Sequence, residues 1–555
     1  MKATKRIFSV FLTCVLAFTM AFAMGLTASA ADTTYTITIT KPAGDIDRTY
    51  EAYQIFKGNL DGNTLSDIEW GTGINGAKFL TELKKNSDYA SCTDAKTVAE
   101  KLASFTENPD KAVAFAKLAG NFLATATATS SANGEIKVPT AGYYLLKDVT
   151  DVTTPHDALS LNILEVVKDV TVNPKADHPT VDKKIGTDIS TGVAANEATI
   201  GDKVPFVIAS KVPKMQGYTK YFFVLNDSMT AGLTYNKDVA IKIGTTTLAA
   251  DAYDVTYDTD ANTMKIVIKN FIDYKSQAGK DIVVTYSATL NEKADLTQDG
   301  NKNTVKLTYS NNPNVDYKGD NEPDSTDPVG ETPEHVTVTY STQLQLTKVN
   351  GADHNEKLKG VEFQITGTSI KTAVSKSGYF KQDAAGTYYQ LKDGTFTETA
   401  PTTETESKYV SNSVKYAKVT DSTEQTKMQK VTASGTTDAN GLITFEGLGA
   451  GTYYITELKT LGGYNLLTAP ITVEIKATPG TTSCTWTAKV NGENATFEDD
   501  MVKLTVENNK GSDLPITGGI GTTIFYVIGG LLVCGAVVMA ITKKKLSVED
   551  KADQN

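Results

Sequence analysis

Three polar side chains in the C-terminal part of the chain occupy positions that the local pattern assigns to a protein core. Each continues a row of apolar residues that alternates with polar ones, as in a β-strand with one buried face. The rows are Leu344, Leu346 and Lys348; Tyr453, Ile455 and Glu457; and Val502, Leu504, Val506 and Asn508. A buried polar group without a partner is costly, so we expect Lys348, Glu457 and Asn508 to meet in one core.

This combination of groups can form a covalent bond. Burial favours the neutral amine of Lys348 and the neutral carboxylic acid of Glu457. The acid can polarise the Asn508 carboxamide while the amine attacks it and ammonia leaves. We predict a Lys348–Asn508 isopeptide bond with Glu457 as its catalyst, and Asn509 is the alternative acceptor. The non-covalent alternative is an ordinary buried Lys–Glu pair capped by the asparagine.

The middle of the chain repeats the pattern with an aspartate in place of the glutamate. Its rows are Val181, Lys183 and Ile185; Phe223, Leu225 and Asp227; and Asn303, Val305, Leu307 and Tyr309. The same reasoning brings Lys183, Asp227 and Asn303 together. Side-chain rows depend on the strand register, so Lys184 and Asn301 remain alternatives.

Strands must position these residues, and most of the chain between its two ends predicts strands. Short alternating runs are bounded by Gly, Asn and Asp turns: YTITIT (35–40), YDVTY (253–257), MKIVIK (264–269), DIVVTYSATL (281–290) and TVKLTYS (304–310). Between two of them, DTDAN (258–262) begins like a calcium loop but lacks its later Gly and Glu, so we predict a hairpin turn. The fold class is all-β, in antiparallel sandwiches.

Residues 94–123 are the exception, because their apolar residues recur at helical spacing and Pro109 lies at a helix start. We predict short helices packed on the core of the first domain. That domain also contains AGYYLLKD (141–148), which echoes AGTYYITEL (450–458) and places Asp148 where the echo has Glu457. Lys41 follows an apolar row, but no asparagine fits, so no bond is predicted there.

Both ends of the chain carry export features. Lys2, Lys5 and Arg6 precede an apolar run and an Ala28-Ser29-Ala30 cleavage site, which predicts a signal peptide over 1–30. A second apolar run, within 522–542, nearly spans a bilayer and is followed by a lysine-rich tail, 543–555, that should stay in the cytoplasm. We therefore expect everything between them to be extracellular.

Composition narrows the class of the exported part. The net charge of −11 includes two basic ends, so the exported part is more acidic still, which argues against nucleic-acid binding. Only Cys92 and Cys484 fall in it, in what we predict to be different domains, so disulfides do not stabilise it. The four histidines have no metal-ligand spacing, and no catalytic or nucleotide-binding motif is present. We predict no metal, no cofactor and no enzymatic turnover.

The sequence LPITG (514–518) directly precedes the second apolar run, and this arrangement resembles the sortase signal of Gram-positive surface proteins. In that family, a transpeptidase cysteine recognises the positions of Leu514 and Pro515. It attacks the carbonyl at the position of Thr517, releases the part that starts with Gly518, and leaves the acyl group to be taken by an amine. The resemblance implies that the chain is a substrate of another enzyme's nucleophilic catalysis.

The amine can belong to the cell-wall peptide or to another copy of the chain. KDVTVNPKADHP (168–179) resembles the pilin motif of sortase-assembled pili, with Asn173 where that family most often has Tyr. The resemblance implies that Lys175 is the acceptor amine, and Pro174 fixes the backbone beside it.

The candidate bond-forming segments add to the resemblance. The C-terminal rows resemble a collagen-adhesin (CNA) B-type domain, whose Glu box matches at Tyr453 and Glu457 but has Leu458 in place of its usual Thr. KGVEFQI (359–365) fits that domain as well. The middle rows resemble a pilin middle domain, which implies a Lys183–Asn303 bond with Asp227 as the catalytic acid.

The chain is thus identified as similar to a major (backbone) pilin of a sortase-assembled Gram-positive pilus. The implied domains are immunoglobulin-like or CNA-B-type sandwiches at 31–176, 177–340 and 341–511, with 368–437 as an insertion in the third. The implied partners are a pilin-specific sortase, a housekeeping sortase with peptidoglycan, identical subunits, minor pilins and a candidate host surface ligand. The alternatives are a monomeric wall-anchored adhesin, a basal or minor pilin, and a wall-anchored hydrolase whose catalytic residues are not found.

Overall fold

The structure is a computed structural model, and the part of the chain that it describes is residues 34–511 with gaps. The gaps are 42–45, 62–63, 106–108, 132–133, 153–156, 168, 175, 368–371, 376–377, 392–394, 404–408, 410–412 and 423–433. The predicted signal peptide, the sorting motif and the second apolar run lie outside the described residues. Within the described residues, no helix is both long and apolar enough to cross a membrane.

The chain divides into two compact units. The first contains the described residues up to Thr342, with Gly447–Ala450 and Lys476–Thr487. The second contains the described residues of Gln343–Glu446, Gly451–Ile475 and Ala488 to 511. Below, the N-terminal region is 34–172, the middle region is 182–340 and the C-terminal region is 342–508. The predicted domain boundaries fall between the last strand of one region and the first strand of the next.

Two sheets form the N-terminal region, and one hydrophobic cluster fills the space between them. The smaller sheet has the order β5-β1-β8: β1 (Tyr35–Ile39), β5 (Glu135–Val138) and β8 (Val170–Val172). The larger has the order β3-β2-β6-β7, with β4 beside β2: β2 (Tyr50–Asp61), β3 (Thr64–Trp70), β4 (Ala128–Thr129), β6 (Gly142–Asp148) and β7 (Ile163–Val167).

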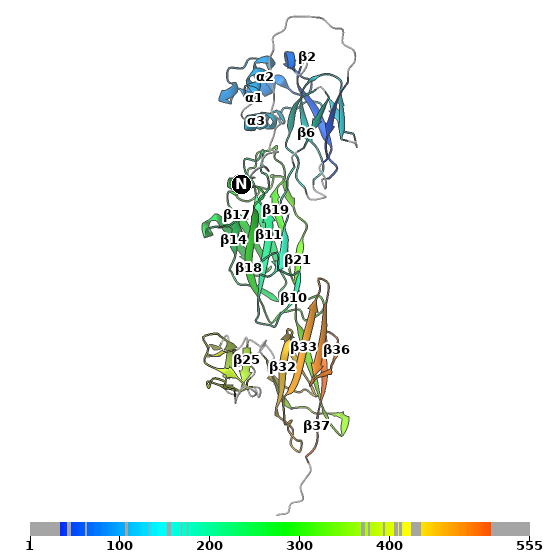
Figure 1. Cartoon of the computed structure of the whole chain (residues 1–555), viewed down its shortest axis with the longest axis vertical. Coiled ribbons are helices and arrows are strands. Elements are labelled where there is room, and N and C mark those ends of the chain that lie inside the picture. The colour runs from blue at the N-terminus through cyan, green and yellow to red at the C-terminus, as the bar shows by residue number, and fades with distance from the viewer. Residues whose placement is uncertain are drawn as a thin grey trace, which may run out of the picture. The chain divides into compact units, whose positions relative to one another are not determined.

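Helices cover the other face of the larger sheet, beside β2 and β6 (Figure 1). They are α1 (Gly76–Leu83), η1 (Ser87–Tyr89), α2 (Ala95–Ala103) and α3 (Pro109–Ala119). Asp94 and Thr97 cap the start of α2 reciprocally, which explains where this helix begins. The helical stripe predicted for 94–123 is confirmed as core packing, but α1 was not predicted.

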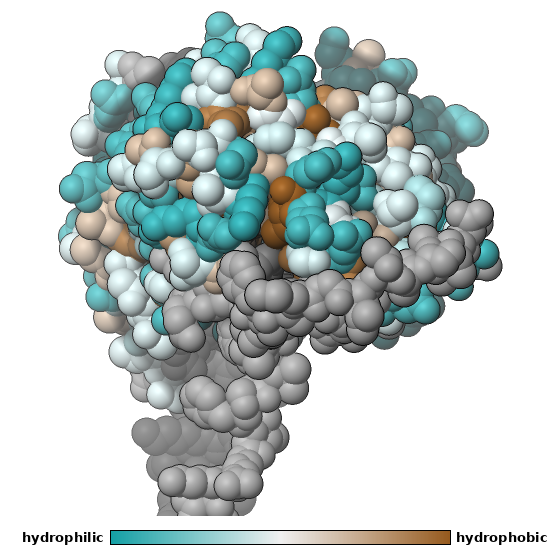
Figure 2. All heavy atoms as spheres, turned by 90° about the horizontal axis from the view of Figure 1, so that it is seen from above, coloured by the Kyte–Doolittle hydropathy of each residue, from teal (hydrophilic) through white to brown (hydrophobic). Residues whose placement is uncertain are grey.

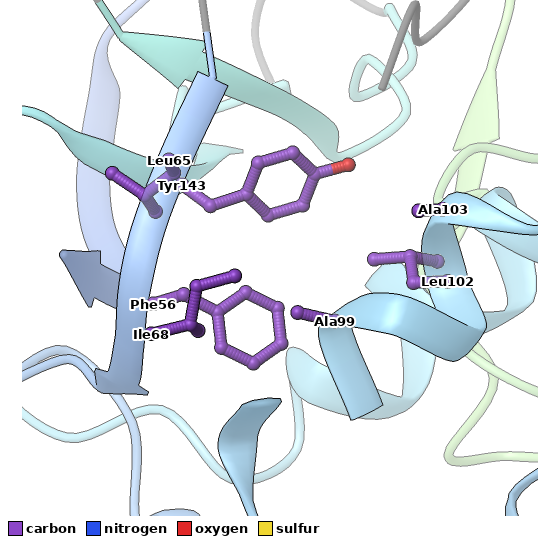
Figure 3. Close-up of a pocket in the computed structure, with 7 residues that line it drawn as sticks. All are labelled: Phe56, Leu65, Ile68, Ala99, Leu102, Ala103 and Tyr143. Atoms are coloured by element: carbon purple, nitrogen blue, oxygen red, sulfur yellow. The ribbon is translucent and has the colours of Figure 1, made fainter. Parts of the chain in front are cut away.

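Between α2 and the sheet lies a small apolar cavity of about 10 Å³ (Figure 3). Seven side chains line it: Phe56, Leu65, Ile68, Ala99, Leu102, Ala103 and Tyr143. It holds about one water-sized volume, so it is a packing gap and not a ligand site.

Two facing sheets form the middle region around one large hydrophobic core. The first has the order β15-β14-β18-β11-β9, with β13 beside β18: β9 (Asp182–Ile185), β11 (Lys203–Lys211), β13 (Leu233–Tyr235), β14 (Ala240–Ile243), β15 (Thr246–Thr247) and β18 (Asp281–Leu290). The second has the order β10-β21-β19-β12-β17-β16, with β20 beside β19: β10 (Ala195–Glu197), β12 (Phe223–Met229), β16 (Tyr253–Asp258), β17 (Thr263–Ile268), β19 (Asn301–Ser310), β20 (Val329–Glu331) and β21 (His335–Tyr340). Short 3-10 turns η2 (Ala250–Ala252) and η3 (Phe271–Gln277) flank β16 and β17.

The hairpin predicted between two of these strands is confirmed. β16 and β17 pair antiparallel up to Asp258 and Thr263. The Asp258 carboxylate accepts hydrogen bonds from the backbone N–H groups of Asp260 and Ala261, and Asn262 adopts a positive φ of 53°. Asp and Asn side chains stabilise tight turns in this way, so this segment is turn chemistry.

Two further sheets form the C-terminal region. The first has the order β23-β22-β37-β36, with β31 beside β22: β22 (Thr342–Asn350), β23 (Asp353–Lys357), β31 (Leu442–Leu448), β36 (Thr496–Glu498) and β37 (Met501–Asn508). The second has the order β30-β24-β32-β33-β34-β35: β24 (Glu362–Gly367), β30 (Ser434–Thr436), β32 (Gly451–Lys459), β33 (Ile471–Pro479), β34 (Cys484–Val490) and β35 (Glu493–Asn494).

The predicted insertion at 368–437 forms small sheets of its own between β24 and β30. They contain β25 (Thr372–Ser375), β26 (Gly378–Gln382) and β29 (Tyr416–Val419), and separately β27 (Tyr389–Gln390) and β28 (Phe396–Thr397). The all-β class with a few helices near the N-terminus is therefore confirmed.

The face drawn in Figure 2 is mostly hydrophilic or neutral, with hydrophobic residues in small spots.

Candidate isopeptide sites

The middle region brings Lys183, Asp227 and Asn303 together in its core. Lys183 lies on β9 of one sheet, whereas Asp227 and Asn303 lie on β12 and β19, which are neighbours in the facing sheet. The Nζ atom of Lys183 lies 2.5 Å from Oδ2 of Asp227 and also donates a hydrogen bond to Oδ1 of Asn303. A Lys183–Asn303 bond would therefore join the two sheets across the core.

Burial sets the protonation states at this middle site. The side chains of Lys183 and Asp227 have no exposed surface. Burial lowers the pKa of Lys183 to about 8 and raises the pKa of Asp227, although the two groups attract each other. Within the described structure Oδ1 of Asp227 has no hydrogen-bond partner, which also favours the uncharged acid. A neutral lysine amine is the nucleophilic form.

Tyr286 completes the middle site, and the sequence pattern did not predict its part. It is buried on β18, in the same sheet as Lys183. Its hydroxyl donates to Oδ2 of Asp227 at 2.7 Å and accepts from Nδ2 of Asn303 at 2.9 Å. Its ring stacks on Phe206, and both ring centroids lie within 5.5 Å of the lysine Nζ. One hydroxyl thus links the acid to the amide.

The two alternatives at the middle site lie elsewhere. The side chain of Lys184 is 31% exposed and lies 3.9 Å from Asp182 at the surface. Asn301 is buried, but its amide donates to the backbone carbonyls of Asp295 and Thr339 and its carbonyl accepts from the backbone of Asp295. Asn301 therefore closes a loop and does not face the lysine.

The C-terminal region brings Lys348, Glu457 and Asn508 together. Lys348 and Asn508 lie on β22 and β37, which are parallel neighbours in one sheet, and Glu457 lies on β32 of the other sheet. The lysine Nζ donates to Oδ1 of Asn508 at 2.6 Å and lies 3.6 Å from Oε1 of Glu457. Nδ2 of Asn508 donates to the same glutamate oxygen at 2.7 Å. One carboxyl oxygen thus faces both the amine and the amide.

The surroundings of Glu457 differ from those of Asp227. Its second oxygen accepts a hydrogen bond from the backbone N–H of Leu467 at 2.8 Å. An open cavity of about 370 Å³ borders Glu457 and is lined by Gln364 and Thr456 among others. Burial lowers the pKa of Lys348 to about 8.

A hydroxyl also contacts the C-terminal amide. Oγ1 of Thr460 accepts a hydrogen bond from Nδ2 of Asn508 at 2.6 Å. Leu458 stands where the resembled Glu box has Thr, so Thr460 supplies a hydroxyl from two residues further along. Asn509, the alternative acceptor, is exposed.

In the N-terminal region, Asp148 lies at the position that echoes Glu457, and its partner is an arginine instead of a lysine. Asp148 on β6 is fully buried, and its Oδ2 lies 3.0 Å from Nη1 of Arg48 and accepts from the backbone of Ser160. A guanidinium stays protonated and cannot attack a carboxamide. Lys41 pairs instead with Asp47 at the surface. The geometry of this region therefore gives Asp148 an ionic partner and no nucleophile.

Through Asp157, the same arginine is linked to the segment that follows the predicted acceptor Lys175. Lys175 itself lies outside the described residues. Nη2 of Arg48 lies 3.0 Å from Asp157, and Nδ1 of His178 lies 2.8 Å from the other oxygen of Asp157. The hydrogen bond to Asp157 raises the pKa of His178. The ring of His178 also stacks on Tyr309 of β19. Ionic contacts thus hold the segment that follows position 175.

No group of three or more potential metal ligands occurs within the described ranges. Leu514, Pro515, Thr517 and Gly518 lie outside those ranges, so the sorting signal stays a prediction from sequence. The residues that sequence reasoning missed are Tyr286, Thr460 and Arg48. Tyr286 shares a strand face with Ile282 and Val284, which places it in the core but does not reveal its partners.

Two family models match the regions that contain the candidate sites. Residues 200–313 match the model described as "Gram-positive pilin backbone subunit 2, Cna-B-like domain". Residues 342–490 match a prealbumin-like fold domain. Together the two matches include Asp227, Asn303, Lys348 and Glu457, and they end before Asn508.

Similar proteins come from Gram-positive bacteria. The trypsin-resistant surface T6 protein of Streptococcus pyogenes serotype M6 is 25% identical over 391 residues, which cover 67% of this chain and 70% of that protein. The solved T6 backbone pilin of serotype M6 Streptococcus pyogenes shares the fold, with a TM-score of 0.53 and 15% identity over 87% of this chain and all of that one. The full-length major pilin SpaD from Corynebacterium diphtheriae gives a TM-score of 0.46 and 15% identity over 87% of this chain and 98% of that one.

Proposed function

We propose that this chain, a Gram-positive backbone pilin with Cna-B-like and prealbumin-like domains, is polymerised covalently into the shaft of a surface pilus. A pilin-specific sortase joins Thr517 of one subunit to Lys175 of the next. A housekeeping sortase then transfers the last subunit to peptidoglycan, and minor pilins complete the fibre. The chain itself is a structural protein and the substrate of these enzymes.

Intramolecular bonds stabilise each subunit of this shaft. The observation that supports them best is the pair of buried Lys–acid–Asn clusters, one in the middle region and one in the C-terminal region. In each, the neutral lysine amine attacks the Cγ carbon of the asparagine, the C–N bond to Nδ2 breaks and ammonia leaves. One amine hydrogen moves to the departing nitrogen, so no other reactant is needed.

Covalent internal bonds suit a fibre that must carry load without disulfides. The two free cysteines, Cys92 and Cys484, are both buried and unpaired. By analogy with disulfide loop closure, each isopeptide bond would stabilise its region by about 4–5 kcal/mol. The candidate sites thus provide the cross-links that the cysteines do not.

Polymerisation is tested by enzymatic release of wall proteins, followed by immunoblotting after boiling in detergent and reductant. Wild-type protein should form a ladder of high-mass species, and Lys175→Ala should collapse it to monomer. Lys137→Ala is the matched control, because Lys137 is an exposed lysine on β5 of the N-terminal region, and it should keep the ladder. A single monomer band in every strain would contradict polymerisation and favour a monomeric wall-anchored adhesin.

A second measurement tests the internal bonds separately. The intact mass of the monomer should be lower than the sequence mass by one ammonia for each bond. Peptide mapping should then recover Lys183 joined to Asn303 and Lys348 joined to Asn508. An unchanged mass would refute the internal bonds, whatever the ladder shows.

A further inference from the structure

We propose that Tyr286 is a catalytic residue of the middle region and relays a proton from Asp227 to the departing nitrogen of Asn303. This inference rests on the proposed Lys183–Asn303 bond. It assigns to Tyr286 a step that the shorter acid cannot perform by direct contact.

The comparison with the C-terminal site shows why a relay is needed. There, one oxygen of Glu457 lies 3.6 Å from the lysine Nζ and 2.7 Å from the amide nitrogen of Asn508. Asp227 is shorter by one methylene group. It contacts the Lys183 Nζ at 2.5 Å, but none of the hydrogen bonds within the described residues links it to the amide nitrogen of Asn303. The hydroxyl of Tyr286 lies between them.

The distances give a continuous path for one proton. When the amine attacks, the uncharged Asp227 gives its own proton toward Tyr286 and takes a hydrogen from Lys183 Nζ in its place. Oδ2 accepts the hydroxyl hydrogen of Tyr286 at 2.7 Å. The hydroxyl oxygen of Tyr286 lies 2.9 Å from Nδ2 of Asn303. The phenol gives its proton to Nδ2 as the C–N bond breaks and recovers one from Asp227. Each group ends in its starting state, and the products are the amide and ammonia.

The hydroxyl of Tyr286 differs from others in the same core. Tyr221 and Tyr309 are also buried, yet their hydroxyls have no hydrogen-bond partner within the described structure. The core therefore accommodates tyrosines for their rings alone. Tyr286 is placed so that its hydroxyl touches the acid and the leaving group at once, which ring packing does not require.

Tyr286→Phe removes the relay and keeps the ring. The full chain is pulse-labelled in a strain that lacks sortase, quenched at intervals and digested, and the joined and free peptides of both sites are quantified. The middle bond should form about 100-fold more slowly or worse, because acid–base groups usually contribute 10²–10⁴-fold. The C-terminal bond in the same molecules should form at the wild-type rate, which provides an internal control.

Two further variants separate the relay from simpler explanations. Tyr309→Phe removes an unpartnered buried hydroxyl from the same core and should leave the middle bond unchanged. Thr460→Val removes the hydroxyl on the C-terminal amide and should slow that bond by less than about threefold, because Glu457 contacts the amide nitrogen directly. An equal slowing in Tyr309→Phe would overturn the relay.

Folding is tested in a background that cannot form the middle bond. In Lys183→Met, the added Tyr286→Phe change should lower the thermal midpoint by no more than the loss of its two hydrogen bonds explains. A middle region that is unfolded at the labelling temperature would assign the slow reaction to poor folding and overturn the relay. If wild type forms no middle bond, the proposed function of this site fails. If wild type forms it and Tyr286→Phe does so equally fast, only the role of Tyr286 fails.

Discussion

The two candidate sites use similar groups but would tie the protein together in different ways. In the C-terminal region, the lysine and asparagine lie on β22 and β37, neighbouring strands of one sheet. In the middle region, the lysine lies on one sheet and the asparagine on the other. The first bond would fasten the first strand of its region to the last, whereas the second would fasten two layers through their shared core.

This difference bears on what each bond resists. A bond between the first and last strands transmits a pulling force directly from one to the other, so the strands between them in the sequence are not loaded. A bond between sheets additionally keeps the two layers from sliding apart. The catalytic acids of the two sites also differ. Glu457 contacts both reacting groups by itself, whereas Asp227 depends on Tyr286 to reach the amide.

The largest expected difference appears when the chain is stretched. Lys348 and Asn508 are 160 residues apart, and Lys183 and Asn303 are 120 apart. Lys348→Met should release a segment on the order of 500 Å and Lys183→Met one on the order of 400 Å, at about 3.3–3.6 Å per residue. Single-molecule force measurements detect these steps. Wild type and Lys184→Met should show only the extension of the N-terminal region, for which no bond is proposed, and further steps of these lengths in wild type would contradict the bonds.

Stability should respond next. Asn508→Ala should lower the free energy of unfolding of its region by about 4–5 kcal/mol, the loop-closure value. Asn303→Ala should cost a similar amount, because each substitution also removes a hydrogen-bond partner from a buried lysine and from a second polar group. Denaturant unfolding followed by hydrogen exchange resolves the two regions. Asn509→Ala is the exposed control and should stay within about 0.5 kcal/mol; an equal loss there would refute the assignment.

The rates of bond formation should depend on pH in both regions. Burial lowers the pKa of Lys183 and of Lys348 to about 8, and only the neutral amine attacks. Below that pH the neutral fraction falls about tenfold per unit, so both bonds should form more slowly at pH 6 than at pH 8. Joined peptides counted after synthesis at each pH provide the measurement. A flat profile in both regions would argue that deprotonation of lysine does not limit the reaction.

The smallest effect is expected at the ion pair between His178 and Asp157, which contrasts with the two sites where covalent bonds are proposed. The raised pKa of His178 means that its contribution is complete below the unfolded value of about 6.5 and is lost as pH rises through the folded value. The effect should be below about 1 kcal/mol, since the imidazole is partly exposed. Hydrogen exchange at Leu159, whose N–H bonds to Asn311, reports it. His178→Gln should flatten this dependence, and the exposed His354→Gln should preserve it.

Strand periodicity predicted the two clusters because a period of two assigns each residue to a face. Lys183, Asp227 and Asn303 each continued an apolar row, and the sheets that bear those rows do face each other. The rows cannot predict which buried groups touch, because contact depends on how the sheets pack. Tyr286 was therefore visible as core but not as a partner of Asp227.

The sequence signals for helix α1 and for the contacts of Arg48 were weaker or absent. Helix α1 carries Phe79, Leu80 and Leu83 at helical spacing after the cap Asn75, a signal that is present but short. Arg48 lies outside any strand, so its contacts with the acids of the N-terminal region depend on tertiary structure alone.

The small sheets between β24 and β30 form an insertion whose two ends lie close together. β24 and β30 pair antiparallel, so the insertion leaves and re-enters the C-terminal region at adjacent points. A segment with its ends held together can lengthen or change at little entropic cost. Lys348 and Asn508 lie on strands of the other sheet. The insertion can therefore change in length or sequence without altering the two strands that carry the proposed Lys348–Asn508 bond.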